Sequence, residues 1–234
     1  MWWKSKDMAK VIFSGASSPL GLQVIKDLSS EHSFLGLYNK NKIVYDVKNI
    51  DWLRVDFTSN FDDKKIISYI KNEKFLVLVC FAASAVDSLI VNMEYNDWKK
   101  VHEINAYSNF QLSKILLPKM IENRWGRIIH ISSTRALNGD IGIGAYSSSK
   151  SALVGLSKTI SKEYGRKNIT SNVLSLGYFS SKLWDDLDSK IKTKLLSQVP
   201  SKKLGSYTNI SNAINFLIKS DYVNGATINI DGGI

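Results

Sequence analysis

The sequence predicts an α/β fold in which a doubly wound, mostly parallel sheet of seven strands carries helices on both faces. Seven short apolar, β-rich runs alternate along the chain with about six segments of helical period, the pattern of a parallel sheet whose strands are joined by helices. The run at 74–81 is almost continuously apolar, as expected for a strand covered on both faces. The 234 residues, 44% of them hydrophobic, suit one domain with a large core.

The elements follow one another without a linker, an internal repeat or a low-complexity tract. The expected strands are 10–13, 34–38, 52–57, 74–81, 126–133, 168–177 and 223–233. The expected helices are 22–28, 62–72, 96–123, 146–165 and 209–220. Residues 178–204 are polar with a weak amphipathic helix, and we expect them to form a substrate loop or lid over the sheet edge. We predict a single domain over 1–234.

A turn of small residues, Ser14 to Gly21, joins the first strand to the first helix. Gly15 and Gly21 bound this turn, which lets backbone N–H groups and the helix N-terminus approach a phosphate. Pro19 fits the first helical turn, where its missing N–H costs little. The flanking strand and helix favour a nucleotide site over the alternative, a compact βα loop without a ligand.

Basic residues follow the second strand. In nucleotide-binding βαβ units an acid at this place accepts hydrogen bonds from an adenosine ribose, whereas a base suits a 2′-phosphate. The sequence has Asn39, Lys40 and Lys42 here and no acid. It therefore favours a 2′-phosphorylated cofactor, with a solvated lysine turn as the alternative. Asp56 is expected to end the third strand at the same sheet edge.

Tyr146 and Lys150 are the clearest candidates for residues that carry out chemistry. Positions i and i+4 share one face of a helix, and a cation beside a phenol lowers the phenol pKa, which would make Tyr146 a proton donor or acceptor. Ser133 lies thirteen residues before Tyr146 and ends a strand. Asn105 lies within an apolar helix, where it serves a site or only satisfies a local backbone group. The alternative for Tyr146 and Lys150 is a solvated helix face.

Composition argues against several other classes of protein. The net charge is +10, but the lysines are dispersed, which disfavours nucleic-acid binding. Cys80 is the only cysteine, and no Cys/His cluster has metal-ligand spacing. The sequence shows no signal-peptide pattern and no apolar run approaching the ~18 residues of a membrane span. We therefore expect a cytoplasmic protein without a metal, a nucleic acid or a membrane as partner.

With these motifs in this order, the chain resembles the short-chain dehydrogenase/reductase family from about Lys10 to Gly233. The turn at Gly15 resembles the family's Thr-Gly-x-x-x-Gly-x-Gly, and Ser133, Asn105 and Tyr146-x-x-x-Lys150 match its Ser, Asn and Tyr-x-x-x-Lys. The segment from Leu176 to Ser181 resembles Pro-Gly-x-x-x-Thr. The departures are Pro19 for the middle glycine, Phe81 and Ala83 for Asn and Gly, and Leu176 for proline.

The resemblance implies a Rossmann-like fold that binds NADP(H), with NAD(H) as the alternative. The residues it places at the cofactor are Gly15, Ser17, Ser18, Leu20, Gly21, Asn39, Lys40, Asp56, Phe57, Ala82, Ala83, Tyr146, Lys150 and Phe179. Tyr146 would exchange the proton with the substrate oxygen and Ser133 would hold that oxygen. Lys150 would lower the Tyr146 pKa and reach the cofactor ribose, and Asn105 would hold a water.

The implied activity is reduction of a ketone to an alcohol, and the chain most broadly resembles 3-oxoacyl-acyl-carrier-protein reductases. A 3-oxoacyl thioester, small or carrier-bound, is one expected substrate, and a keto-sugar or specialised metabolite is another. The alternative function is a catalytically silent nucleotide-binding sensor or partner protein, which the Phe81-Ala82-Ala83 stretch supports. Family members imply a homodimer or homotetramer.

Overall fold

The computed structural model describes residues 8–40, 47–180 and 182–234. Lys42 and Ser181, which entered the sequence predictions, lie outside the described residues. The strands are β1 (Lys10–Ser14), β2 (Ser33–Tyr38), β3 (Ile50–Arg54), β4 (Leu76–Cys80), β5 (Gly126–Ser133), β6 (Ile169–Leu176) and β7 (Thr227–Ile230). The helices are α1 (Pro19–Leu28), α2 (Asp63–Ile70), α3 (Tyr95–His102), α4 (Ser108–Asn123), α5 (Arg135–Asn138), α6 (Gly144–Tyr164), α7 (Lys182–Asp185), α8 (Ser189–Gln198) and α9 (Tyr207–Lys219), with a π turn at Glu103–Tyr107 and single 3₁₀ turns at Ile90–Asn92 and Gly165–Lys167.

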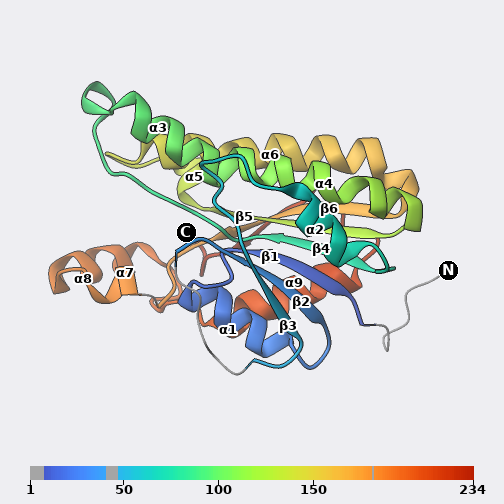
Figure 1. Cartoon of the computed structure of the whole chain (residues 1–234). Helices are drawn as coiled ribbons and strands as arrows, with labels where there is room; N and C mark the ends of the chain where they lie inside the picture. The colour runs from blue at the N-terminus through green and yellow to red at the C-terminus, as the bar shows by residue number, and fades with distance from the viewer. Residues whose placement is uncertain (1–7, 41–46, 181) are drawn as a thin grey trace.

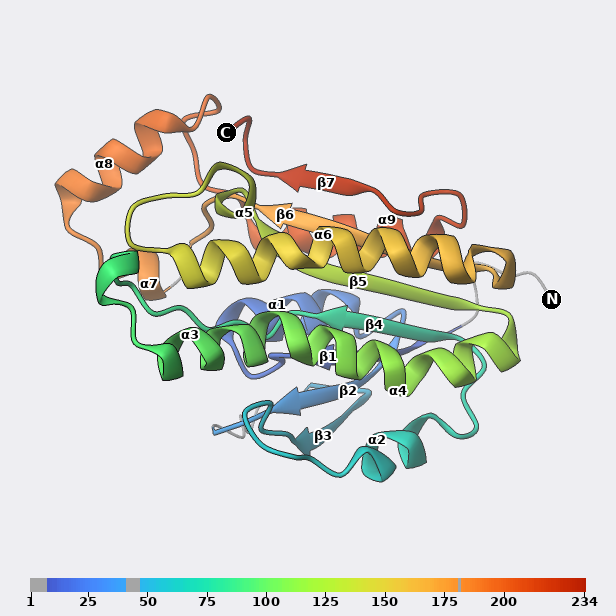
Figure 2. The same ribbon diagram turned by 90° about the horizontal axis from the view of Figure 1, so that it is seen from above.

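The described strands form one sheet in the order β3-β2-β1-β4-β5-β6-β7, and every pair is parallel. Helices α2, α4 and α6 cover one face and α1 and α9 cover the other (Figures 1 and 2). The predicted doubly wound, seven-stranded α/β fold is confirmed. The chain runs outward from β1 in one direction to β3 and from β4 in the other to β7, so the order switches between β1 and β4, where open α/β sheets bind ligands.

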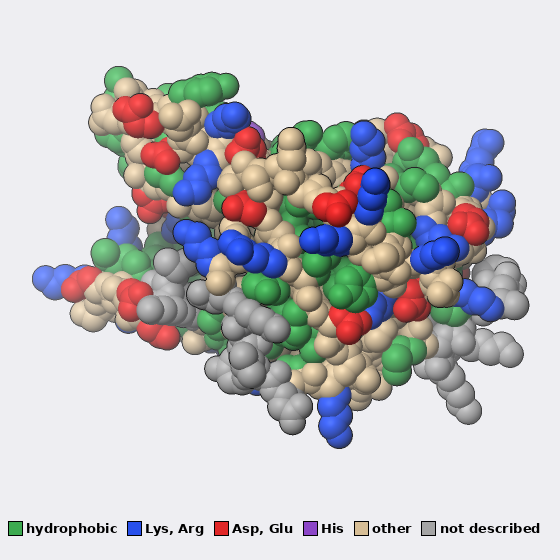
Figure 3. Space-filling view, viewed as in Figure 1, with side chains coloured by type: hydrophobic (Ala, Val, Ile, Leu, Met, Phe, Trp, Pro, Cys, Tyr) green, Lys and Arg blue, Asp and Glu red, His purple; other side chains and the backbone are tan. Residues whose placement is uncertain are grey.

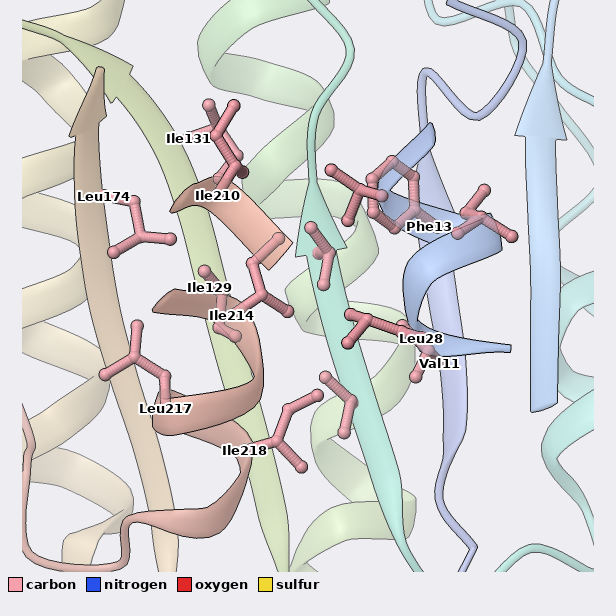
Figure 4. Packing of buried hydrophobic residues seen from close by; sticks show 14 of the residues in the cluster. Val11, Phe13, Leu28, Ile129, Ile131, Leu174, Ile210, Ile214, Leu217 and Ile218 are labelled. Carbon is pink, nitrogen blue, oxygen red and sulfur yellow. The ribbon is translucent and has the colours of Figure 1, made fainter. Parts of the chain in front are cut away.

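Two apolar layers, one on each face of the sheet, hold the fold together. Between the sheet and α1 and α9, the core includes Val11, Phe13, Ile129 and Leu174 from strands, and Ile214 from α9 (Figure 4). A second cluster fills the space beneath α2, α4 and α6. Strand residues alternate between the two layers because successive side chains point to opposite faces.

The predicted helix at 96–123 differs in one respect. It is interrupted by the π turn at Glu103–Tyr107, which lies between α3 and α4 and contains Asn105. Such turns are rare and occur frequently at functional sites. Hydrophobic periodicity does not reveal one, because a single wide turn shifts the apolar face only slightly.

The segment at 178–204 contains two short helices, α7 and α8, that project from the side of the molecule to which the strands point (Figure 2). α8 has no buried residue. No helix in the described ranges is long and apolar enough to cross a membrane. Lysine and arginine side chains are spread among acidic and neutral ones over the face in Figure 3.

Candidate active site

Helix α6 presents Tyr146 and Lys150 to the carboxyl end of the sheet, one turn apart as predicted. The Lys150 side chain is buried, with 2% of the residue exposed, and its Nζ donates a hydrogen bond of 2.7 Å to the carbonyl oxygen of Ile131 in β5. The same Nζ lies 5.9 Å from the centre of the Tyr146 ring. A solvated helix face is therefore excluded for this pair.

Ser133, the last residue of β5, joins this pair. Its hydroxyl acts on the Tyr146 phenol and lowers the pKa of that phenol, and its Oγ accepts the backbone N–H of Arg135 at 3.3 Å. Ser132, one residue earlier, donates through its Oγ to the carbonyl oxygen of Lys150 at 3.1 Å. The strand end and helix α6 are thus tied together at the point where the three predicted residues meet.

The structure does not bear out the expectation that Lys150 lowers the pKa of Tyr146. Burial raises the pKa of Tyr146, and the opposing influences come from the Ser133 hydroxyl and then the Arg135 charge. Burial lowers the pKa of Lys150 to about 8. Helical spacing predicted the proximity of the two groups correctly, but it could not show that desolvation, which disfavours the phenolate, outweighs nearby charge. Tyr146 is accordingly a protonated phenol at neutral pH.

Asn105 is buried in the π turn and its amide is fully used. Its Oδ1 accepts the N–H of Ser84 at 2.7 Å, and its Nδ2 donates to the Ser84 carbonyl at 2.8 Å and to Ser149 Oγ at 2.9 Å. Ser149 Oγ in turn donates to the Tyr146 carbonyl at 2.7 Å. Asn105 therefore links the segment after β4 to the helical turn that carries Tyr146, rather than satisfying its own helix.

Two further buried polar residues that the sequence did not single out extend this link. Asn109 of α4 donates through Nδ2 to the Asn105 carbonyl at 2.9 Å, and its Oδ1 lies 2.8 Å from His130 Nδ1. Because the Asn109 oxygen only accepts, the imidazole carries its proton on Nδ1. Burial, and then the charge of Lys150, lower the pKa of His130 to about 3. In the sequence, the polar His130 in the middle of the apolar run of β5 could have indicated this buried contact.

The glycine turn packs directly against the backbone that follows β4. Gly15 has φ +72°, and a Cβ there would lie 2.8 Å from the Cα of Ala82. Ser14 Oγ accepts the N–H groups of Phe81 and Ala82 at 3.0 and 3.1 Å. Only glycine fits such a contact, because a left-handed φ and a backbone neighbour both disfavour a side chain.

Ser18 and Pro19 define the start of α1. Ser18 is the N-cap, and its Oγ accepts the N–H of Gly21 at 3.0 Å and donates to the Gly15 carbonyl at 2.9 Å. Pro19 occupies the first helical position, as expected. The Pro19 departure from the family motif is thus accommodated by an ordinary helix start. The N-terminus of α1 points to the β1–β4 switch, where it could hold a pyrophosphate.

Phe81 and Ala83, the departures after β4, have different environments. The Phe81 ring stacks on Phe13 with centroids 5.3 Å apart and packs against the core, whereas Ala83 is exposed. The Phe81 substitution therefore replaces a polar side chain by core packing, and it leaves the small residues Ala82 and Ala83 at the strand end.

The third strand is shorter than predicted, and Asp56 does not end it. β3 stops at Arg54, and Asp56 lies two residues beyond, where its Oδ1 accepts the N–H of Thr58 at 2.9 Å and the Thr58 hydroxyl at 2.7 Å. These two bonds are the main reason that the pKa of Asp56 is lowered. The carboxylate accepts hydrogen bonds from its own turn, and this local bonding competes with the backbone pairing that would extend the strand. Composition does not reveal which of the two prevails.

Arg54 is a residue that the sequence analysis missed. It pairs in register with Tyr38 at the end of β2, and its Nε donates to the Asn39 carbonyl at 3.1 Å. An exposed guanidinium thus lies beside Asn39 and the exposed Lys40, where a cofactor 2′-phosphate is expected. In the sequence, Arg54 is a charged residue that interrupts an apolar run, and this could have marked it as a candidate.

The remaining predicted cofactor residues lie in the turn after β1, beside the core or within it. Ser17 is half-buried in the turn, and Leu20 packs against the core. Phe57 contacts the ring of Phe61 edge-on, with centroids 5.8 Å apart. The Phe179 side chain is 8% exposed and belongs to the core, so that side chain is committed to packing against Gly205.

Taken together, these contacts fit a dinucleotide that crosses the switch point. The Gly15 turn and the α1 N-terminus could hold its phosphates, Asn39, Lys40 and Arg54 its adenosine end, and Lys150 the ribose at its reactive end. A Rossmann-like sheet with a Tyr, a Ser and a buried Lys at this edge defines the class of an oxidoreductase that uses a nicotinamide cofactor.

The chain belongs to the short-chain dehydrogenase/reductase family. A family model described as enoyl-(acyl carrier protein) reductase matches residues 40–234. The chain is 33% identical to a 3-oxoacyl-(acyl-carrier-protein) reductase of Rickettsia felis, over 92% of this chain and 87% of the relative. It is 30% identical to the reductase of the same name from Buchnera aphidicola, covering 95% and 96%, and 29% identical to nodulation protein G of a Rhizobium species, covering 96% of each.

Proposed function

We propose that this protein uses NADPH to reduce the ketone of a 3-oxoacyl thioester to an alcohol, with Tyr146 as the proton donor. The observation that carries the proposal is the meeting of three groups at the end of β5: the buried ammonium of Lys150 at the Ile131 carbonyl, the Tyr146 ring 5.9 Å from it, and the Ser133 hydroxyl that acts on the phenol. The names of the relatives support the 3-oxoacyl group as substrate over a keto-sugar.

The protonation state of Tyr146 is compatible with a proton donor for reduction. Hydride transfer to a ketone creates an alkoxide, and a proton must arrive as the charge develops. A phenol whose pKa is raised by burial keeps its proton at neutral pH, so Tyr146 is in the donor state. The nicotinamide would supply the hydride, and the protein supplies position and acid.

Each neighbour of Tyr146 has a defined task in this proposal. Ser133 donates a hydrogen bond to the substrate oxygen and holds the carbonyl in place. Lys150 donates one N–H to the Ile131 carbonyl, and its other N–H groups would bind the ribose of the cofactor. Asn105 fixes the Tyr146 turn against the segment after β4.

Preference for NADPH over NADH follows from the charges at the end of β2. Lys40 is exposed there, and Arg54 lies beside Asn39. Both cations suit a 2′-phosphate, and no carboxylate occupies the position that would hold a ribose hydroxyl pair among the residues described at this strand end. Assembly as a homodimer or homotetramer and a cytoplasmic location stay predictions.

The deciding experiment compares the wild-type protein with Tyr146→Phe. NADPH oxidation would be followed with a panel of 3-oxoacyl thioesters, keto-sugars and small ketones. Loss of the phenolic proton should lower kcat by roughly 10²- to 10⁴-fold, while the NADPH dissociation constant changes little because the ring remains. Near-wild-type rates in Tyr146→Phe would remove Tyr146 from the mechanism. Tight NADPH binding without turnover of any ketone would favour the catalytically silent alternative.

A further inference from the structure

Arg135 places a guanidinium group at the candidate active site, and the proposed reaction gives it no task. The residue follows Ser133 by two positions, and its backbone N–H donates to Ser133 Oγ at 3.3 Å. Its Cζ lies 5.6 Å from the ring centre of Tyr178, which follows β6. Its charge also acts on the phenol of Tyr146. The Arg135 backbone therefore contacts Ser133, and the guanidinium acts electrostatically on Tyr146.

The hydrogen-bonding capacity of Arg135 is only partly used. Its Nη2 forms a loose ion pair with Asp140 at 3.6 Å, and 48% of the Asp140 side chain is exposed. That distance exceeds the ~2.7–2.9 Å of a charge-assisted hydrogen bond. Its Nε is buried and has no hydrogen-bond partner among the described residues. A buried, unsatisfied donor is uncommon and calls for a specific explanation, such as a bound ligand.

A 3-oxoacyl substrate supplies an acceptor for the guanidinium, whose side chain is 32% exposed. Such a substrate has two carbonyl groups separated by one carbon, so the second oxygen lies close to the ketone oxygen held by Ser133 and Tyr146. A guanidinium presents several N–H groups in one plane and matches a carbonyl or carboxylate oxygen. A simple ketone offers no second oxygen and would leave the donor unsatisfied.

We propose that Arg135 is a specificity-determining residue that donates a hydrogen bond to the second carbonyl oxygen of the 3-oxo substrate. The inference rests on the proposed function, because it assumes that the ketone oxygen binds at Ser133 and Tyr146. Sites built to hydrogen-bond a substrate group discriminate strongly against analogues that lack it, since a buried polar group is then left unpaired. Arg135 thus distinguishes a 3-oxoacyl compound from a monoketone, which lacks the second carbonyl.

The test compares two variants with two neutral substrates. Arg135→Leu removes the donor, and Lys162→Gln removes one charge from the exposed end of α6, remote in sequence from the site. The substrates are the N-acetylcysteamine thioester of 3-oxobutanoate and 2-heptanone. For the thioester, kcat/KM of Arg135→Leu should fall at least about tenfold further than for 2-heptanone, because only the thioester loses a hydrogen bond to a charged donor, whereas the altered Tyr146 pKa affects both substrates.

Asp140→Asn serves as a second variant that leaves the guanidinium in place. Release from its ion pair should keep or increase kcat/KM for the thioester, so the variant separates substrate recognition from the structural value of the Arg135–Asp140 pair. Equal losses for both substrates in Arg135→Leu, or a loss in Asp140→Asn as large as in Arg135→Leu, would overturn the proposal.

Binding measurements distinguish a failure of this inference from a failure of the proposed function. If the wild-type protein reduces no ketone, the function fails, and calorimetric binding of the thioester in the presence of NADP⁺ still tests Arg135. Arg135→Leu should then weaken thioester binding about tenfold relative to wild type. An unchanged dissociation constant would overturn the role of Arg135. The tyrosine Cζ NMR signal of Tyr146, assigned with Tyr146→Phe, should titrate at higher pH in Arg135→Leu because a nearby cation is gone.

Discussion

At the scale of single residues, the environment rather than the residue type sets the chemistry. Tyr146 and Lys150 have the spacing of a catalytic pair, but their pKa values move in directions set by burial: upward for the phenol and to about 8 for the ammonium. The neutral phenol suits proton donation. Arg54 and Arg135 carry charges that the sequence left unassigned, and both lie where a ligand oxygen is expected.

The role of Arg54 leads to a prediction about cofactor choice. Arg54→Gln should weaken NADPH binding about tenfold, since a hydrogen bond to a charged group contributes roughly 1.5 kcal/mol, and should leave NADH binding unchanged. Fluorescence or calorimetric titration with both cofactors measures this. Lys64→Gln, an equal charge change on the exposed surface of α2, is the control. Equal weakening of NADPH and NADH binding would show that Arg54 does not contact the 2′-phosphate.

At the scale of elements, the glycine turn and the strand ends are fixed by close backbone contacts. Gly15 touches Ala82 through the backbone, and Ser14 Oγ holds two N–H groups of the same segment. The π turn places Asn105 so that one amide reaches both Ser84 and Ser149. Helix α6, the β4 end and the turn after β1 are therefore oriented by polar contacts, while the apolar layers hold the helices to the sheet.

A pair of glycine substitutions tests this view of the turn. Gly15→Ala should lower the free energy of unfolding by at least about 2 kcal/mol, because the left-handed φ and the contact with Ala82 both oppose a Cβ. Gly155→Ala, at an exposed site within α6 where a Cβ meets nothing within 4 Å, should raise it by about 0.5–1 kcal/mol. Urea denaturation measures both. An unchanged free energy of unfolding in Gly15→Ala would mean that the turn adjusts more readily than its contacts indicate.

At the scale of the whole molecule, polar residues inside the second apolar layer make stability depend on pH. His130 lies beneath α4 and α6, paired with Asn109 of α4, opposite Cys80 of β4 and within the field of Lys150 of α6. Its protonation would place a second cation in this layer. The layer therefore tolerates only the neutral imidazole.

The sign of the pH effect follows from the lowered pKa. Unfolded His130 binds a proton near its ordinary pKa of about 6.5, whereas the folded residue does so only near 3, so stability is lost as pH falls through this window. Between pH 6.5 and 5 the loss from this residue should be on the order of 2 kcal/mol. Urea unfolding of wild type and His130→Leu at both pH values isolates it, since the lowered pKa values of His32 and His102 affect both proteins equally.

If the difference between wild type and His130→Leu does not change between these pH values, the imidazole is already charged in the fold or exposed to solvent. The lowered pKa values of Glu31 and Asp56 contribute below this window, because carboxylates titrate near pH 4.

The sequence by itself determined the α/β class, the seven strands, the helix that carries Tyr146 and Lys150, and the glycine turn with Pro19 at the helix start. These are local properties, since period, turn chemistry and capping act over a few neighbouring residues. Ser133 was also identified from its spacing to Tyr146, and Asn105 from the resemblance to the family; the structure brings Ser133 to Tyr146 and links Asn105 to it through Ser149.

Only the tertiary structure decided the direction of the Tyr146 pKa, the end of β3 before Asp56, the π turn, the commitment of Phe179 to the core, and the positions of Arg54, Arg135 and His130. Each depends on groups far apart in the chain that meet at the carboxyl edge of the sheet or beneath its helices. Desolvation and long-range hydrogen bonds are set by those neighbours, so no local pattern in the sequence could carry the information.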